Sequence, residues 1–347
     1  MINAIFLILI SINGDFTIKE RLNLSLEYDS NVYRRPSNTG ENIISDSDIK
    51  LQSDLSLKYL RDRHLYKANI LNGGKLFFNE SDANTVVTMI DTSYLFKISR
   101  FSPEIGIELK DITTVKTAQD YSLIKPYISF NYFSDLFFIK LIGDYEKFIF
   151  DVNNDYSYNA AAAGLVTAYQ IDENLNLNLN YLFRYIVYDS YAYRRLGNLD
   201  QDSILTTRTE KSRQDINHNL IIRLNYESDI LLSISYNPEI NSSNSVGESV
   251  FRQRLQLSMT SMLFFKIYLN MLLSFMISSF KDGILISDQL LLINDNENRN
   301  YIIIKLSRDI SRKLMLEVKY SYYYSEFSNY ITQFSRNVTA FGICYKF

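Results

Sequence analysis

The chain has 347 residues, of which 46% are hydrophobic, and its 36 Lys and Arg residues against 39 Asp and Glu residues give a formal net charge of −3. The apolar content excludes a disordered chain, and the near-neutral balance argues against a nucleic-acid-binding protein. The single cysteine, Cys344, excludes an internal disulfide bond and a cysteine-based zinc site. The longest apolar run, Ala4–Ile10, is far shorter than the roughly 18–20 residues of a membrane-spanning helix.

The first residues have one feature of an export signal, because Ala4–Ile10 has the length of a signal-peptide hydrophobic region. The three residues before this run include no Lys or Arg, and no A-x-A cleavage pattern follows it. A cut after Gly14 is the best candidate. We therefore predict a signal peptide over residues 1–14 and a single domain over residues 15–347. The alternative is a first strand or a truncated start.

Beyond residue 15 the chain alternates between apolar and polar residues. In residues 175–187, Leu, Tyr, Phe and Val occupy the odd positions, while Asn and Arg occupy most of the even positions. Successive side chains of a strand point to opposite faces, so each such segment has one apolar and one polar face. No comparable stretch shows a helical period, and the only candidate helix lies around Asp202–Asp215.

The length of these segments indicates a membrane β-barrel. The alternating runs reach about eleven to fourteen residues, whereas soluble strands peak near five or six and a tilted membrane strand needs about 9–11. Short turns and longer loops also follow one another, as they do in outer-membrane barrels. The short turns are 60–64, 99–103, 134–136, 172–174 and 227–229, and the long loops are 29–46, 189–213, 239–248 and 281–300.

The fold class that we predict is all-β, a transmembrane antiparallel barrel of about sixteen strands, with fourteen or eighteen as alternatives. The segments near residues 85, 157 and 300 have the poorest patterns. An even count places both ends of the chain on the side of the short, periplasmic turns. The sixteen strands are expected to start near residues 18, 47, 65, 85, 104, 121, 137, 157, 175, 214, 229, 250, 266, 300, 314 and 335.

The aromatic residues fall mostly at the ends of the predicted strands, which suggests two interfacial girdles. The alternative is the core of a soluble β-sandwich. The short-turn girdle would contain Tyr59, Tyr66, Phe96, Phe101, Phe137, Tyr169, Tyr226 and Tyr268. The opposite girdle would contain Tyr28, Phe77, Tyr121, Phe150, Tyr185, Tyr188, Tyr236, Phe275 and Tyr322.

The polar faces of the strands predict a charged aqueous lumen, because side chains alone do not fill a barrel of about sixteen strands. Charged side chains at these positions would tune ion selectivity. The alternative is a network of salt bridges that only solvates the wall. The predicted lumen-lining residues are Arg21, Glu27, Lys50, Asp54, Lys58, Lys110, Lys140, Arg184, Arg223, Arg252, Arg254, Glu317 and Lys319.

The segment Asp189–Arg213 is the best candidate for a constriction in this lumen, because the third loop, 114–120, is too short to fold inward. Long ordered loops are often functional, although disorder is the other common explanation. Basic residues there would attract anionic solutes or sugars. The residues assigned to this constriction are Arg194, Arg195, Asp200, Asp202 and Arg208.

Few residues suggest catalysis. An omptin-like hydrolase at the rim would pair His218 with a nearby Asp, of which Asp200, Asp202 and Asp215 are candidates, but His218 shares its strand face with apolar Ile216. The chain contains no Gly-x-Ser-x-Gly, His-Glu-x-x-His, phosphate-binding or EF-hand motif. We therefore predict neither an enzyme nor a cofactor nor a metal site. Cys344 is expected to be an inert thiol that faces the lumen.

Two short segments resemble known families. Phe341, Ile343, Tyr345 and Phe347 resemble the C-terminal signature of outer-membrane barrels that the barrel-assembly machinery reads. The segment Glu27–Arg34 resembles the first-strand exit of the β-barrel porins associated with exopolysaccharide export. The resemblance implies a bacterial outer-membrane location, and it implies outer-membrane lipid, periplasmic chaperones, the barrel-assembly machinery and polysaccharide as partners. It assigns no functional residues.

The sequence thus predicts a porin-like channel for passive diffusion or polysaccharide export through a charged aqueous lumen. One alternative is a structural or surface-assembly barrel with a plugged lumen. The other is the rim hydrolase of omptin type.

Overall fold

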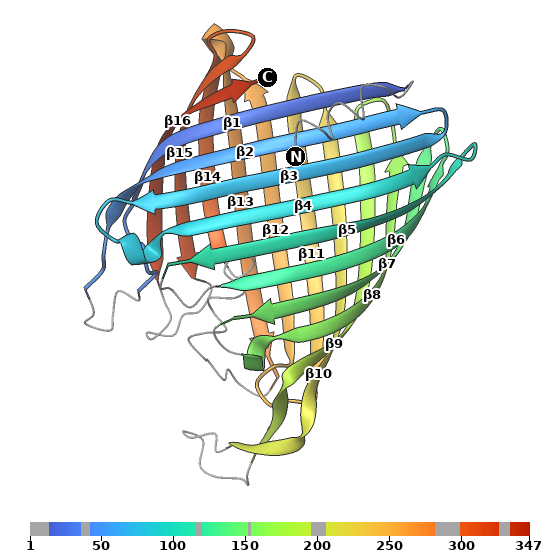
Figure 1. The fold of residues 1–347 in the computed structure, drawn as a ribbon, viewed down its shortest axis with the longest axis vertical. Helices are drawn as coiled ribbons and strands as arrows, with labels where there is room; N and C mark the ends of the chain where they lie inside the picture. The colour runs from blue at the N-terminus through green and yellow to red at the C-terminus, as the bar shows by residue number, and fades with distance from the viewer. Residues whose placement is uncertain are drawn as a thin grey trace.

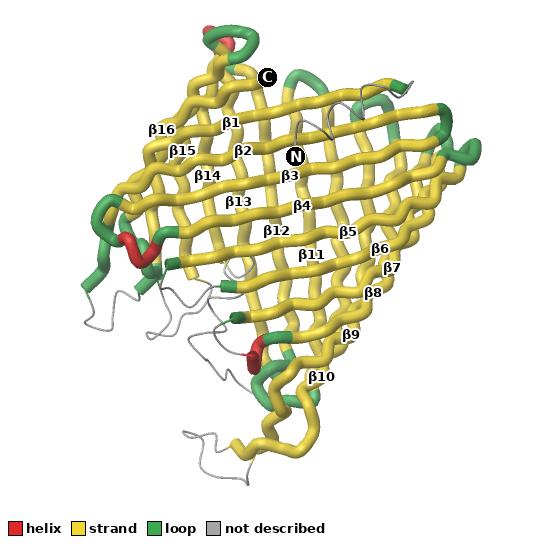
Figure 2. The backbone as a smooth tube through the Cα atoms, in the orientation of Figure 1, coloured by secondary structure: helices red, strands yellow, loops and turns green. Residues whose placement is uncertain are grey.

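The computed structural model describes residues 14–35, 42–115, 120–151, 154–195, 206–281, 299–325 and 334–347. These residues form sixteen antiparallel strands that close into a barrel (Figures 1 and 2), which confirms the predicted fold class. The strands are β1 (Asp15–Asp29), β2 (Asp46–Arg61), β3 (His64–Phe77), β4 (Thr85–Phe96), β5 (Phe101–Thr114), β6 (Tyr121–Phe133), β7 (Phe137–Phe150), β8 (Tyr158–Gln170), β9 (Leu175–Arg195), β10 (Thr206–Glu227), β11 (Ile230–Ser243), β12 (Val250–Met262), β13 (Ile267–Phe280), β14 (Arg299–Asp309), β15 (Leu314–Ser325) and β16 (Ser335–Lys346). The predicted signal peptide lies outside the described residues, apart from Gly14.

Closure of the sheet follows from the pairing of the first and last strands. β1 pairs with β16 from Arg21 opposite Lys346 to Asp29 opposite Val338, while its other edge pairs with β2. Lipid offers no hydrogen bonds to a free sheet edge, so closure satisfies the backbone groups of every strand. Three single-turn 3₁₀ helices, Ser81–Ala83, Asn154–Tyr156 and Phe264–Lys266, lie in connections. In the described part of the chain, no helix is long and apolar enough to cross a membrane.

The two faces of the sheet differ in the way that the alternation predicts. The outer face presents large apolar side chains on all sides, and Leu24, Leu51, Ile128 and Leu255 are each about half exposed. The inner face holds the buried residues. Its buried apolar side chains are Phe148, Phe150, Ala160, Ile186, Val250, Met276, Val338, Ala340 and Cys344. The barrel therefore has its apolar belt outside and its buried side chains inside.

The strand starts agree closely with the sequence expectation except at β10, and the end of β9 lies further along the chain than expected. β9 continues to Arg195, and β10 begins at Thr206 instead of near residue 214. The predicted long loop 189–213 is therefore mostly a β-hairpin. The candidate helix at 202–215 is wrong for residues 206–215, and its first residues lie outside the described ranges. This hairpin extends beyond the barrel wall (Figure 1), so no lipid belt imposes on it the apolar alternation that identifies the other strands.

The predicted girdles are correct only in part. Tyr28, Tyr66, Phe101, Tyr169 and Phe275 point outward and are exposed. Several other aromatic residues have the inward parity, which corrects their assignment to a girdle: Phe77, Tyr121, Phe150, Tyr188 and Tyr268. The position of a residue at a strand end does not determine its face, because a shift of one residue reverses the side chain.

Candidate functional site: the barrel lumen

The register brings all thirteen predicted lumen residues onto the inner face. Arg21 lies opposite Asp54, Lys50 lies opposite Lys75, and Lys305 lies opposite Lys319. The others occupy the same face of their strands: Glu27, Lys58, Lys110, Lys140, Arg184, Arg223, Arg252, Arg254 and Glu317. Their effect on ion selectivity remains a prediction.

A first charged cluster lies toward the long-loop end of β1–β3. Lys75 forms an ion pair with Glu27, and its Nζ lies 3.4 Å from Asp48 Oδ2. The Nζ of Lys50 lies 3.9 Å from Glu27 Oε1. Glu27 and Asp48 are 3% and 0% exposed, so buried carboxylates are held beside two lysines. Sequence reasoning found Glu27 and Lys50 but missed Asp48 and Lys75. Lys75 follows Gly73 and Gly74, which interrupt the apolar alternation.

A second cluster lies at the seam, where β1 pairs with β16 and the barrel closes. Arg336 Nε lies 2.9 Å from both carboxylate oxygens of Asp29, whose side chain is fully buried. The backbone N–H of Asn31 donates to Asp29 Oδ1 at 3.0 Å, and the Asn31 amide donates to the Ser335 carbonyl at 3.2 Å. Asp29 and Asn31 belong to the segment that resembles the polysaccharide-associated porins. In this structure they join β1 to the start of β16.

A third cluster occupies the same end of β7–β9. Arg184 Nη2 donates to Glu146 Oε1 at 2.8 Å, and the Tyr158 hydroxyl donates to the same oxygen. The Tyr158 ring lies 4.9 Å from the Phe148 ring and 5.3 Å from the Tyr188 ring, measured between centroids. The three rings form an aromatic row on the inner wall, and of these only Tyr188 was assigned to a girdle by the sequence analysis.

The row of rings ends at a further ion cluster on β10–β12. The Arg213 guanidinium lies 4.0 Å from the centroid of the Tyr188 ring. Its Nη2 lies 2.7 Å from Asp215 Oδ2 and 3.0 Å from Glu248 Oε2. Glu248 lies in the loop after β11, where burial raises the pKa of its carboxyl group above the usual value, although Arg213 opposes the shift. On the inner wall beside it, Arg252 Nη1 lies 3.2 Å from Glu239 Oε1.

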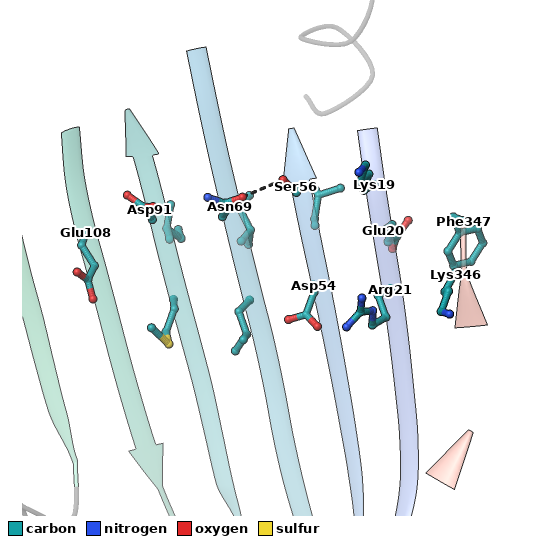
Figure 3. A pocket seen from close by; sticks show the side chains of 15 residues that line it. Lys19, Glu20, Arg21, Asp54, Ser56, Asn69, Asp91, Glu108, Lys346 and Phe347 are labelled. Carbon is teal, nitrogen blue, oxygen red and sulfur yellow. Dashed lines mark hydrogen bonds between the residues drawn. The ribbon is translucent and has the colours of Figure 1, made fainter. Parts of the chain in front are cut away.

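The short-turn half of the lumen has a smaller buried cluster and a pocket. Glu104 Oε2 accepts hydrogen bonds from Lys140 Nζ and Ser129 Oγ, both at 3.2 Å. The pocket has a volume of about 790 Å³ and lies on the inner wall of β1–β5 beside the end of β16 (Figure 3). Arg21 and Asp54, two of the predicted lumen residues, contribute to its lining.

The three predicted constriction residues that the structure describes lie on the β9–β10 hairpin and not across the lumen. The β9–β10 hairpin projects beyond the barrel wall (Figure 1), with Arg194 and Arg195 on β9 and Arg208 on β10. Arg208 lies 3.9 Å from the centroid of the Tyr191 ring. Asp200 and Asp202 fall outside the described residues. The described part of the segment is therefore an extension of the sheet, and the idea of a loop across the pore does not apply to it.

The described residues do not bring His218 together with an Asp side chain, as the hydrolase hypothesis requires. His218 lies on the outer face, where its Nδ1 is 2.8 Å from the Tyr181 hydroxyl. Asp215 has the opposite parity, and its carboxylate is bound by Arg213.

The two faces of β16 carry different residues. Cys344 is buried on the inner face, where it lies opposite Asn23 of β1. The outer face carries Phe341, Ile343, Tyr345 and Phe347.

No family model and no curated protein matches the sequence. Solved structures with the same fold include a BenF-like porin from Pseudomonas fluorescens, with 9% identity, a TM-score of 0.53, and coverage of 95% of this chain and 99% of that chain. OccAB3 of Acinetobacter baumannii has 9% identity and a TM-score of 0.50, with 95% and 99% covered. OmpT, an outer membrane protein of Vibrio cholerae, has 10% identity and a TM-score of 0.50, with 97% and 98% covered. The chain has the fold of outer-membrane porins, which indicates a location in the bacterial outer membrane.

Proposed function

We propose that the protein is an outer-membrane channel through which hydrophilic solutes diffuse passively, without a chemical step. The observation that carries this proposal is the inner face of the closed barrel, which bears charged side chains of both signs from one end to the other. A sixteen-stranded barrel leaves room for water. Water in the lumen solvates these charges, whereas the apolar outer belt faces lipid.

Conductance in planar lipid bilayers tests this function directly. The full chain, folded in detergent and added to the bilayer, is expected to give discrete current steps. A barrel that inserts, as shown by protease protection in vesicles, but never conducts would contradict the proposal. It would favour the plugged structural barrel instead. The inward residues near the long-loop end, such as Phe150 and Asp48, give that second candidate its support because they are fully buried.

Polysaccharide export is a more specific form of the same proposal. It is supported by the resemblance of Glu27–Arg34 to porins of export systems, although Asp29 and Asn31 already have structural roles at the seam. A polysaccharide that enters the lumen would interrupt the ion current, so soluble polysaccharide added on one side of the bilayer is the probe. Current steps that are unaffected by polysaccharide would limit the function to small solutes.

The proposed partners are outer-membrane lipid, periplasmic chaperones and the barrel-assembly machinery. The support is the outward row Phe341, Ile343, Tyr345 and Phe347 on β16. The apolar belt requires lipid once the barrel is folded and requires shielding before that, because an exposed apolar surface of this extent promotes aggregation.

A further inference from the structure

The pocket near the short-turn end of the lumen has an ordered arrangement of charge. Ten of its fifteen lining residues form two adjacent rows of inward side chains, which run across the strands in register (Figure 3), and the other five have the outward parity. In one row, Arg21 lies opposite Lys346 on β16 and Asp54 on β2. In the other row, Asn69 on β3 lies between Ser56 on β2 and Asp91 on β4.

Positive charge gathers at one end of this pocket. Lys19 and Arg21 lie on β1, and Lys346 lies directly across from Arg21 on β16. Two like charges in direct opposition destabilise a strand pair. Asp54 on the other side of Arg21 offsets part of this charge, and its carboxylate accepts a hydrogen bond from Gln52 Nε2 at 3.2 Å.

Negative charge gathers at the opposite end. Asp91 on β4 lies directly across from Glu108 on β5, which is a second pair of like charges. Lys125 faces Glu108 from β6, and the Tyr127 hydroxyl donates to Asp91 Oδ1 at 3.4 Å. Within the described ranges, neither Glu108 nor Arg21 belongs to an ion pair, so both ends of the pocket keep charge that a solute can neutralise.

The middle of the pocket is neutral. The Ser56 hydroxyl donates to Asn69 Oδ1 at 2.9 Å, and the Asn69 amide nitrogen lies on the side away from Ser56 (Figure 3). Beside these residues, Leu71 on β3 and Met89 on β4 lie opposite each other and form an apolar part of the lining. Strands in a sheet are about 4.8 Å apart, so the three steps from β1 to β4 separate the charged ends by roughly 14 Å.

We propose that this pocket binds a linear zwitterionic solute, with a short unblocked peptide as the matching chemistry. The peptide carboxylate would lie near Lys19 and Arg21, and its ammonium group would lie near Asp91 and Glu108. An extended peptide of four residues spans roughly 13–14 Å, which matches the separation of the ends. The inference rests on the proposed channel function, because a solute reaches this wall through the lumen.

Calorimetric titration of the full chain, folded in detergent, tests the pocket independently of conductance. The probe is tetraalanine, compared with N-acetyl-tetraalanine, which lacks the cation, and tetraalanine amide, which lacks the anion. Exposed ion pairs contribute up to about 1 kcal/mol, so each capped peptide is expected to bind about threefold to fivefold more weakly. Dialanine, which is too short to reach both ends, is expected to bind as weakly as the capped peptides.

Substitutions test which residues bind the ammonium group of the peptide and which bind its carboxylate. The double variant Asp91→Asn with Glu108→Gln is expected to remove the preference for tetraalanine over the N-acetylated peptide. Arg21→Gln is expected to reduce the preference over the amide. Arg223→Gln is the matched control, because it removes an inward-facing cation outside the pocket and is expected to leave both preferences intact.

The outcomes separate this inference from the channel function. Equal affinity of wild type for all four peptides, or preferences that persist in the Asp91 and Glu108 variant, would overturn the pocket assignment even if the channel conducts. Selective tetraalanine binding by a barrel that never conducts would support the pocket and count against the channel. Heat-modifiable migration of each variant in gels verifies that the barrel is folded.

Discussion

The buried ion pair between Asp29 and Arg336 is a single contact whose contribution to the free energy of unfolding can be predicted. The Asp29 side chain is fully buried and has its partner on a strand from the other end of the chain. Removal of one member of a buried ion pair leaves the other without a counter-charge and costs about 3–5 kcal/mol. Asp29→Asn is therefore expected to lower the free energy of unfolding by about this amount, measured by urea unfolding of the barrel in lipid vesicles.

Asp309→Asn provides the control for this prediction. Asp309 pairs with Lys346 at 3.3 Å, but their side chains are 45% and 40% exposed. Exposed pairs contribute about 0–1 kcal/mol, so this variant should unfold almost like wild type. If both substitutions had equal effects, the seam would not depend on the buried pair.

Glu248 should make the free energy of unfolding depend on pH in a direction that its raised pKa determines. Burial raises the pKa of its carboxyl group, so the folded barrel holds this proton more tightly than the unfolded chain does. Stability contributed by this residue therefore increases as the pH falls from neutral through the raised pKa towards the ordinary value. Glu248→Gln removes this titration. The difference in unfolding free energy between wild type and variant should shift in favour of wild type as the pH is lowered, and a constant difference would contradict the assignment.

At the scale of elements, strand identity was predictable because the apolar belt imposes a period of two wherever a strand crosses lipid. β4, β8 and β14 have the poorest patterns, yet they are present, since barrel closure requires a partner for each neighbouring edge. The extension of β9 and β10 was not predictable in this way. It lies beyond the barrel wall, where no lipid belt imposes a period of two. Its contacts include a hydrogen bond that the Val246 N–H donates to the Tyr193 carbonyl, at 3.0 Å.

The hairpin also yields a test of the constriction hypothesis. Tyr193 lies directly opposite Arg208, so a two-residue Asn-Gly turn can replace residues 194–207 without changing the register. Because the described part of the hairpin projects away from the barrel, the single-channel conductance of this variant should equal that of wild type. A larger conductance would show that the removed residues restrict the pore.

At the scale of the whole molecule, the inward faces of the strands meet only because the barrel closes. Sequence parity correctly placed Arg21, Glu27 and Lys50 on one face, since each alternates with the apolar residues of its strand. It did not reveal which of them pair. The pairing of Glu27 with Lys75 crosses from β1 to β3, and that of Asp29 with Arg336 crosses the seam, so both depend on strand tilt and register rather than on local pattern.

The last strand allows a test that separates assembly in the cell from the stability of the folded barrel. The Phe347 side chain is 61% exposed on the outer face and contacts the Tyr345 ring at a centroid distance of 4.6 Å. Little of this ring is buried, so Phe347→Ala is expected to change the unfolding free energy of the purified barrel only slightly. If the outward row of β16 is read by the barrel-assembly machinery, the same variant should accumulate less folded barrel in the outer membrane. Heat-modifiable migration measures that yield, and unassisted refolding into vesicles is the control. Equal loss in cells and in vesicles would mean that Phe347 acts on folding itself, whereas normal yield in both would remove the assembly signal from this residue.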